Sequence, residues 1–182
     1  MLKNKRILII GGAGFIGGEL ARVLNIENSV YVLDNYFTGR RDRNQKEIVY
    51  IEGNAKDINS ISILSDLGLD YVFHLGEYSR VEASFADVDL VFEYNHSSIY
   101  AVLKFVSAHD AKLIYSGSST KFGDSGESAA SSPYAWTKKT NVDLIKSYDD
   151  WFGLDYAITY FYNVYGDNEI SDGKYSTVVA KF

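Results

Sequence analysis

The chain has 182 residues, 46% of them hydrophobic, and a formal net charge of −6. This length is sufficient for one well-packed core, so we expect a single domain. The acidic balance argues against nucleic acid as a partner, because binding to phosphate backbones requires clustered lysine and arginine side chains. The chain has no cysteine, which excludes a disulfide framework and a thiolate metal site, and its three histidines lack the spacing of metal ligands. We therefore expect no metal, and a small molecule as the ligand.

The apolar runs of the chain bear on its localisation. The short run behind Lys3, Lys5 and Arg6 breaks into glycines, unlike a signal peptide, and no apolar run approaches the length that spans a membrane. We expect a cytoplasmic protein without a membrane partner.

The first predicted strand, Arg6–Ile10, runs directly into a glycine-rich turn. Gly11, Gly14 and Gly17 follow it, at the start of a segment with helical apolar spacing. Glycine at Gly11 and Gly14 leaves room for a sharp turn and for a diphosphate against the backbone, and Gly17 lets the helix lie close to the sheet. The free N–H groups at such a helix start bind phosphate. The turn predicts a dinucleotide site, although its spacing alone also fits an ordinary structural turn.

The second predicted strand, Val30–Asp34, ends on a carboxylate about twenty residues after the glycines, as in dinucleotide-binding folds. An acidic side chain here accepts hydrogen bonds from the adenosine ribose hydroxyls and repels the 2′-phosphate of NADP, so NAD is favoured. Arg40 and Arg41 could reach a 2′-phosphate. Solvated loop charges are the simpler interpretation of these two residues.

The remaining strand-like runs alternate with helical or loop segments, and they lie at Ile48–Glu52, Tyr71–Leu75, Lys112–Tyr115 and Tyr156–Tyr160. This alternation predicts an α/β fold with a doubly wound, parallel, Rossmann-like sheet. The longest helices are expected at Leu90–Ala108 and Tyr134–Trp151. The first is apolar around much of its circumference, so we expect a second buried face, either in the core or against another subunit.

The second long helix carries a pair of residues that could take part in catalysis. Tyr134 and Lys138 are four residues apart, which places them on one helix face. A lysine ammonium beside a phenol favours the ionised phenol and turns it into a useful base. Ser118 lies at the carboxyl end of the preceding strand, where ligands of open α/β sheets bind, and its hydroxyl could meet the substrate oxygen that the tyrosine deprotonates. A polar turn that satisfies local backbone groups is the alternative for this serine.

Further motifs follow in order along the chain. They are DNYFTGR at Asp34–Arg40, GNAKDI at Gly53–Ile58, VFHLG at Val72–Gly76, the single Asn95, and FYNVYG at Phe161–Gly166. Together with the glycine turn, Ser118 and the tyrosine–lysine pair, they resemble the extended short-chain dehydrogenase/reductases. The resemblance is to the NAD-dependent nucleotide-sugar epimerases and dehydratases in particular, and it extends from Lys5 to Phe182.

The resemblance implies the cofactor contacts. It assigns to NAD the residues Gly11, Gly14, Phe15, Ile16, Gly17, Asp34, Asn35, Asp57, Ile58, Leu75, Gly76, Asn95, Lys138 and Phe161. Within this set, Asp57-Ile58 would border the adenine, Leu75-Gly76 would line the cofactor, Phe161 would lie by the nicotinamide, and Lys138 would hold the nicotinamide ribose. Asn95 would lie near both cofactor and substrate.

The substrate side is also implied by the resemblance. Ser118, Tyr134 and Asn163 would contact a nucleotide sugar, favoured as a UDP-sugar, with Asn163 at its diphosphate. Residues 1–182 would form an NAD-binding domain in which 161–182 begin a substrate-binding segment. Members of the family continue well past the position of Phe182, so the capping part of that segment is expected to be largely absent. A homodimer through the two long helices is implied as well.

Several positions depart from the usual pattern of the family and leave the sugar open. The pair Gly76-Glu77 replaces two alanines, Gly117 a serine, Phe122 a tyrosine, and Tyr160 an arginine.

The residues after Ser118 bear on the reaction. The resembling dehydratases carry an Asp-Glu pair after the catalytic hydroxyl, and decarboxylases a Glu, whereas here Ser119 and Thr120 follow. We therefore expect a nucleotide-sugar 4-epimerase that works through a transient 4-keto sugar, with Tyr134 as base and acid, tuned by Lys138. The alternatives are a dehydratase or reductase on the same scaffold, and a non-catalytic NAD-binding fragment.

Overall fold

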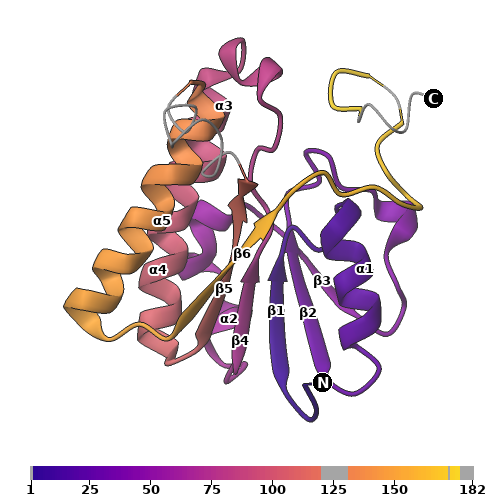
Figure 1. The fold of residues 1–182 in the computed structure, drawn as a ribbon. Coiled ribbons are helices and arrows are strands. Elements are labelled where there is room, and N and C mark those ends of the chain that lie inside the picture. The colour runs from indigo at the N-terminus through magenta and orange to yellow at the C-terminus, as the bar shows by residue number, and fades with distance from the viewer. Residues whose placement is uncertain (1, 120–130, 172, 177–182) are drawn as a thin grey trace.

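The computed structural model describes residues 2–119, 131–171 and 173–176, and they form a six-stranded parallel sheet with helices on both faces (Figure 1). The strand order is β3-β2-β1-β4-β5-β6. Strands β1 to β3 are therefore added toward one edge of the sheet and β4 to β6 toward the other, so the order of addition reverses between β1 and β4. The strands are β1 (Arg6–Ile10), β2 (Ser29–Asp34), β3 (Val49–Glu52), β4 (Tyr71–His74), β5 (Lys112–Ser118) and β6 (Tyr156–Phe161). The predicted doubly wound, Rossmann-like α/β fold is confirmed.

The helices divide between the two faces of the sheet. The α-helices are α1 (Phe15–Leu24), α2 (Ser62–Ser65), α3 (Val88–Val91), α4 (Ser98–His109) and α5 (Pro133–Phe152). Three 3₁₀ segments, η1 (Arg41–Arg43), η2 (Ala55–Ser60) and η3 (Glu82–Phe85), and one π-helical segment, η4 (Phe92–Ser97), complete the described helices. Figure 1 shows α4 and α5 on one side of the sheet and α1 on the other.

Two apolar clusters follow from the alternation of side chains along the strands. In β1, Leu8 and Ile10 belong to the cluster beneath α4 and α5, and Ile7 and Ile9 to the cluster beneath α1. Successive side chains of a strand point to opposite faces, so a strand buried on both sides is apolar throughout, as β1 is. All four side chains are at most 2% exposed.

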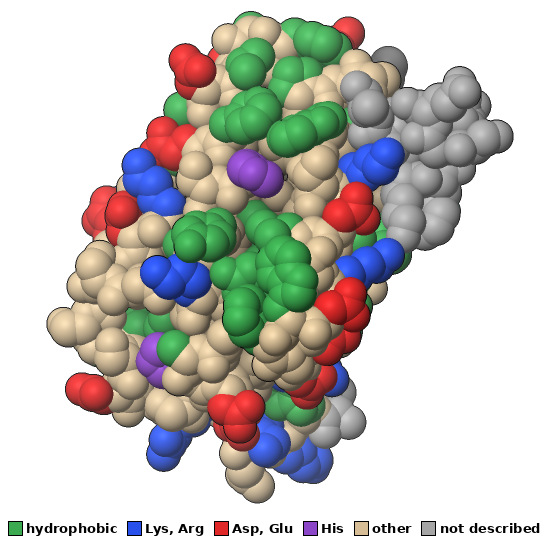
Figure 2. Space-filling model, turned by 90° about the vertical axis from the view of Figure 1, so that its left-hand side faces the viewer, with side chains coloured by type: hydrophobic (Ala, Val, Ile, Leu, Met, Phe, Trp, Pro, Cys, Tyr) green, Lys and Arg blue, Asp and Glu red, His purple; other side chains and the backbone are tan. Residues whose placement is uncertain are grey.

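The helix predicted at Leu90–Ala108 is observed as three joined pieces, α3, η4 and α4. Its apolar circumference is largely accounted for within one subunit, because most of its large aliphatic and aromatic side chains are buried, among them Val91, Ile99, Val102, Leu103, Phe105 and Val106. Phe92 and Tyr100 are exposed by 39% and 54%. Figure 2 shows hydrophobic side chains gathered on this side of the molecule, over α4 and α5.

Local hydrogen bonds determine where β5 ends and where α5 begins, next to the candidate catalytic residues. β5 continues three residues beyond the predicted end at Tyr115, because its hydrogen-bond ladder with β6 extends to the pairing of Ser118 with Phe161. α5 begins where the Ser132 hydroxyl accepts a hydrogen bond from the Ala135 N–H at 3.1 Å, with Pro133 in the first turn.

The described residues offer neither a membrane span nor a cluster of metal-binding side chains. None of their helices has both the length and the apolar character needed to cross a membrane. They also contain no group of three or more histidine, cysteine, aspartate or glutamate side chains that could hold a metal ion.

Candidate active site

The glycine turn after β1 is held by contacts between backbones. Gly11 has φ +82°, and a Cβ there would lie 2.5 Å from the Gly76 nitrogen, so the turn packs directly on the loop after β4. A Cβ on Gly17 would overlap the Gly11 carbonyl oxygen, which fixes α1 close to the turn. Gly12, which the sequence analysis did not single out, lies against the Val32 methyl groups. At Gly14 the nearest atom to a Cβ is the Gly11 oxygen, at 3.3 Å.

The start of α1 lies beside this turn and has no side-chain cap. Gly14 is the N-cap and provides no side-chain cap, and the first turn of the helix has no acidic residue. The N–H groups of Phe15, Ile16 and Gly17 therefore lack partners within the helix and stand at the positive end of its dipole. A glycine turn without side chains, next to free N–H donors, fits the diphosphate of a dinucleotide.

Asp34 links the end of β2 to the glycine turn. Its Oδ2 accepts a hydrogen bond from the Ala13 N–H at 2.9 Å, and its Oδ1 accepts one from the Tyr36 N–H at 2.8 Å. Burial raises the pKa of the Asp34 carboxyl, and the two backbone hydrogen bonds oppose this rise. Each carboxylate oxygen has a second lone pair, so Asp34 can still accept from ribose hydroxyls. The neighbouring Asn35 donates to Asn54 Oδ1 at 2.8 Å.

The two arginines that could have indicated NADP have acidic partners. Arg40 pairs with Asp42, and Arg41 pairs with Glu52, in each case at 2.5 Å between exposed side chains. The Arg41 guanidinium also lies over the Tyr36 ring, 4.0 Å from its centroid. This pairing favours their interpretation as loop charges.

The residues assigned to the adenine and to the cofactor wall lie along the carboxyl edge of the sheet. Ile58 is fully buried in the core, so its side chain serves packing, whereas Asp57 beside it is exposed. The Leu75 N–H donates to the Ile10 carbonyl at 2.9 Å and brings Gly76 against the glycine turn. Phe161 ends β6 opposite Ser118.

Lys138 is buried in a polar network that the sequence analysis did not predict. Its ammonium nitrogen lies 2.5 Å from Glu77 Oε2, and their side chains are 7% and 1% exposed. It donates to the Ser116 carbonyl at 2.7 Å and, over a longer distance of 3.4 Å, to Ser116 Oγ. Tyr115 donates to Glu77 Oε2 at 2.9 Å, and Asn141 donates to Oε1 at 3.1 Å.

Tyr134 lies one turn before Lys138 on α5 and is half-buried. Burial lowers the pKa of Arg80, in the loop after β4, and the nearby Tyr134 opposes this shift. Burial also raises the pKa of the Tyr115 hydroxyl. Ser118 is buried at the end of β5, the strand that precedes α5. The structure therefore places the tyrosine, the lysine and the serine on adjacent elements at one edge of the sheet.

Asn95 lies within the π-helical segment η4 and is fully buried. Its Oδ1 accepts from the Tyr78 N–H at 2.7 Å, and its Nδ2 donates to Thr137 Oγ1 at 3.0 Å. Asn95 thus fixes the loop after β4 against α5. A π-helical turn at such a position is common beside functional sites.

Two of the departures from the family pattern are in contact. Gly117 and Tyr160 face each other in the β5–β6 register, and a Cβ on Gly117 would lie 2.9 Å from the Tyr160 ring. Glycine at 117 leaves the space that the tyrosine ring fills. Asn163 follows in an exposed segment, and Phe122 lies outside the described residues.

The segment after β6 crosses the carboxyl edge of the sheet toward the side of α1 (Figure 1). Arg80 Nε donates to the Tyr175 carbonyl at 2.7 Å, and Lys174 pairs with Asp87 at 2.6 Å. The Tyr175 ring packs edge-on against Phe37, with 5.3 Å between centroids. Residues from the far end of the described chain thus lie over the loops that follow β2 and β4.

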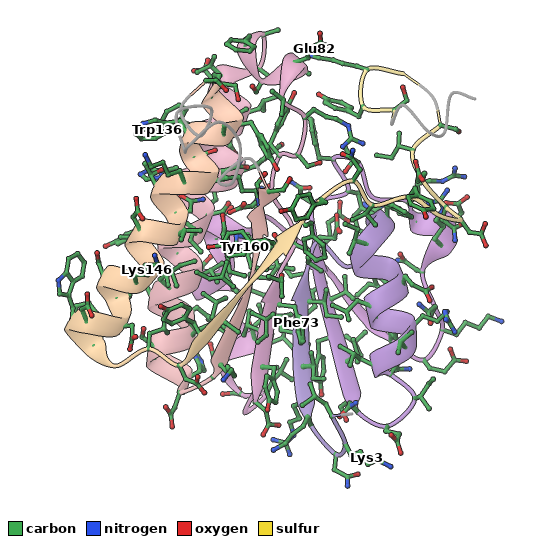
Figure 3. The ribbon with its side chains drawn as sticks, viewed as in Figure 1. Lys3, Phe73, Glu82, Trp136, Lys146 and Tyr160 are labelled. Atoms are coloured by element: carbon green, nitrogen blue, oxygen red, sulfur yellow. The ribbon has the colours of Figure 1, made fainter. Side chains whose placement is uncertain are left out.

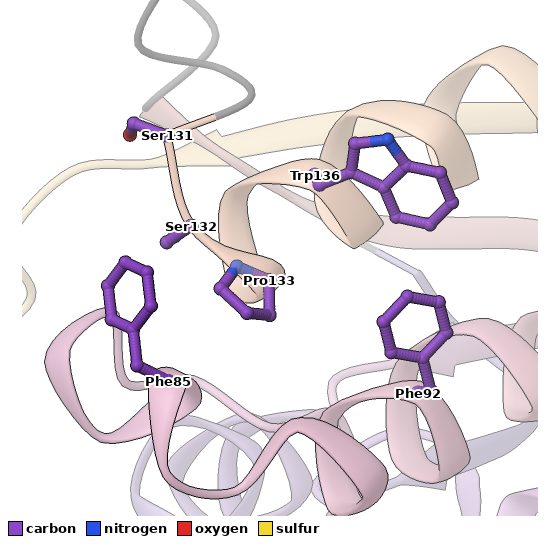
Figure 4. A pocket seen from close by; sticks show the side chains of 6 residues that line it. All are labelled: Phe85, Phe92, Ser131, Ser132, Pro133 and Trp136. Atoms are coloured by element: carbon purple, nitrogen blue, oxygen red, sulfur yellow. The ribbon is translucent and has the colours of Figure 1, made fainter.

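A separate open pocket of about 250 Å³ lies on the outer side of the start of α5 (Figure 4). Three of its six lining residues are aromatic, and the full lining is Phe85, Phe92, Ser131, Ser132, Pro133 and Trp136. None of these residues belongs to the glycine turn or to the Lys138 network.

The chain is similar to known proteins in sequence and in fold. A sequence profile described as the NAD dependent epimerase/dehydratase family matches residues 7–182. The chain is 29% identical to UDP-glucose 4-epimerase of Lactobacillus helveticus, over 92% of this chain and 54% of that protein. It is 27% identical to dTDP-D-glucose 4,6-dehydratase of Homo sapiens, over 98% of this chain and 55% of that protein.

Among solved structures, one similar protein is a UDP-N-acetylglucosamine 4-epimerase from Methanobrevibacter ruminantium M1 in complex with UDP-N-acetylmuramic acid. The TM-score is 0.89 at 28% identity, and the match covers 99% of this chain and 62% of that one. The chain spans about half the length of the curated relatives it matches.

Proposed function

The chain belongs to the NAD-dependent epimerase/dehydratase family. We propose that it acts as a nucleotide-sugar 4-epimerase in which Tyr134 is both base and acid. The cofactor is NAD, and the glycine turn, the open start of α1 and Asp34 are the residues that would hold it. The observation that carries the proposal is the joint position of Ser118, Tyr134 and Lys138 at the edge of the sheet where this cofactor site lies.

Each of these residues has a separate task. Tyr134, as tyrosinate, takes the proton from the sugar 4-hydroxyl and later returns it. Ser118 orients that hydroxyl, and Lys138 favours the ionised tyrosine through its positive charge. When bound, NAD supplies the hydride chemistry at the same sugar carbon. Inversion then requires only that the transient 4-keto sugar turns over in the pocket, so no further acid or base is needed.

A dehydratase is the second candidate, because one of the similar proteins is a dTDP-D-glucose 4,6-dehydratase. Elimination requires an acid for the leaving hydroxyl, and Ser119 and Thr120 provide none. Glu77 is a carboxylate close to Lys138, but its side chain is 1% exposed and its oxygens contact Lys138 and other protein groups. It is therefore not placed to protonate a substrate, and epimerisation is favoured.

The experiment incubates the purified chain and NAD with UDP-glucose or UDP-N-acetylglucosamine and follows the sugars by proton NMR. We expect the C4 epimers to form, and a Tyr134→Phe variant to lose about a hundredfold or more in rate. Tyr31→Phe, on β2, is the matched control. Absence of interconversion, with wild type and Tyr134→Phe behaving identically, would contradict the proposal.

Two other outcomes identify the alternatives. Loss of water, seen by mass spectrometry, would indicate a dehydratase, and a net change in hydrogen content a reductase. Affinity for NAD without affinity for any UDP-sugar would favour a non-catalytic NAD-binding fragment. The last outcome bears on the substrate-binding segment proposed to begin at residue 161, of which the structure describes 161–171 and 173–176.

We also propose a homodimer through α4 and α5. Support comes from large aromatic side chains that remain exposed on these helices, including Tyr100, Trp151 and Phe152, the last two by 63% and 66%. Exposed aromatic side chains of this size are typical of protein interfaces.

A further inference from the structure

Glu77 is a buried charge whose surroundings are defined by direct contacts. It follows β4 in the loop that Gly76 packs against the glycine turn, and its side chain is 1% exposed. Removing a carboxylate from water costs several kcal/mol unless other groups replace the lost hydration. The replacing groups are Lys138 at 2.5 Å, Tyr115 at 2.9 Å and Asn141 at 3.1 Å.

Lys138 is the group that compensates the charge of Glu77. His74 Nε2 lies 3.5 Å from Glu77 Oε1, but burial lowers the pKa of His74 to about 4, so this ring is neutral near pH 7. Tyr115 donates as a neutral hydroxyl, because burial raises its pKa well above the usual value. The ammonium that compensates Glu77 therefore belongs to the same face of α5 as Tyr134, which lies one turn before Lys138.

The other titratable groups near the site come from several elements. They are His74 on β4, Arg80 in the following loop, Tyr115 on β5, Tyr134 and Lys138 on α5, and His96 on η4, whose Nδ1 lies 3.1 Å from Asn141 Oδ1. Among these groups, Lys138 is the one that forms an ion pair with Glu77 within hydrogen-bond distance.

We propose that Glu77 is a positioning residue of the site: it fixes the Lys138 ammonium against the end of β5 and, by neutralising it, restrains the ionisation of Tyr134. This rests on the proposed role of Tyr134 as the base. Lys138 and Asn141 lie three residues apart on α5, and both contact the Glu77 carboxylate, so one side chain orients this helix face. The nearly neutral pair supplies less attraction to a tyrosinate than an unpaired ammonium would.

The test measures the ionisation of Tyr134 without turnover. The near-ultraviolet tyrosinate absorbance of the full chain is titrated, and the titration of a Tyr134→Phe variant in the same background is subtracted. In Glu77→Gln, which keeps the shape but removes the charge, we expect the tyrosinate midpoint to move to lower pH by about one unit. In Glu77→Asp, which keeps the charge, we expect a midpoint within a few tenths of a unit of wild type.

The matched control is Glu27→Gln. Glu27 pairs with Lys3 at 2.5 Å, as Glu77 does with Lys138, but their side chains are 35% and 62% exposed. Figure 3 shows Lys3 at the amino-end edge of the sheet, opposite Glu82. This substitution changes the net charge equally and should leave the midpoint unmoved.

A double variant keeps the test decisive if Glu77→Gln does not fold. Lys138→Gln leaves Glu77 uncompensated and should move the midpoint to higher pH, and Glu77→Gln/Lys138→Gln should return it to near the wild-type position. An unchanged or raised midpoint in Glu77→Gln, or equal midpoints in the two Lys138 variants, would overturn the proposal. The titration does not measure turnover. If only the proposed epimerase activity fails, the midpoints of the variants still shift as expected, but no sugar is converted.

Discussion

Gly17 and Gly18 are adjacent in α1 and allow a matched test of the turn geometry. A Cβ on Gly17 would overlap the Gly11 carbonyl oxygen and lie 2.9 Å from Gly12 Cα, and all of these are backbone atoms. A Cβ on Gly18 would have its nearest neighbour, the Gly12 oxygen, at 3.6 Å, an ordinary van der Waals distance. The same glycine-to-alanine change therefore has opposite consequences one residue apart.

The magnitudes follow from two opposing effects. Alanine stabilises a helix interior by roughly 0.5–1 kcal/mol relative to glycine, which is the whole effect expected for Gly18→Ala. Gly17→Ala gains the same amount but must displace backbone, and overpacking of this kind costs about 1–3 kcal/mol. We expect the unfolding free energies of the two variants to differ by about 2 kcal/mol, or roughly 4–8 °C in Tm for a chain of this size.

The assay combines urea unfolding with a titration of NAD. Gly17→Ala should be the less stable variant and should bind NAD more weakly, because α1 and its free N–H groups move away from the turn. Gly18→Ala should match or exceed wild type in stability and keep its NAD affinity. Equal stability and equal NAD affinity in the two variants would refute the view that close packing of α1 on the turn builds the cofactor site.

Three further changes have defined outcomes. In the folded chain His74 stays neutral down to about pH 4, whereas in the unfolded chain it is protonated below about pH 6.5. The free energy of unfolding should therefore fall by roughly 3 kcal/mol as pH falls from 6.5 to about 4. In urea unfolding at a series of pH values, His74→Phe should lack this fall. Asp34→Asn can accept from only one of the Ala13 and Tyr36 N–H groups, so we expect NAD affinity by calorimetry to fall about tenfold or more, and an unchanged affinity would contradict the assignment. Trp151→Glu should shift sedimentation from dimer to monomer, whereas Ile26→Glu, which is 73% exposed after α1, should not; a wild type that sediments as a monomer would remove the dimer proposal.

Most of the fold was predictable because its signals are local. A buried parallel strand must be apolar on both faces, so β1 was predicted with the bounds that the structure has, and the other five strands were placed within a few residues. The end of β5 was missed because Ser116 and Gly117 are polar or small, and only the ladder with β6 extends the strand to Ser118. The division of the long helix by the π-helical segment η4 was not predicted either.

The candidate site was only partly predictable, because several of its interactions join distant segments. Spacing on one helix places Tyr134 near Lys138, and a strand end places Ser118. The pairing of Lys138 with Glu77 joins α5 to the loop after β4, and no local pattern announces it. Its one available signal was the departure from the usual alanine pair, which indicated a changed site without indicating the partner of the carboxylate.

The two departures at Gly76 and Glu77 have one physical explanation. A Cβ on Gly76 would lie 3.0 Å from both the Gly11 nitrogen and the Ile10 side chain, so even an alanine would press the loop after β4 away from the glycine turn. The next residue, Glu77, reaches Lys138 at 2.5 Å, a contact that tolerates little displacement of that loop. Glycine at 76 therefore permits the close approach that a buried carboxylate at 77 requires. The turn expected to hold the diphosphate and the ion pair beside the tyrosine are thus joined through one backbone contact, so a change on either side alters the other.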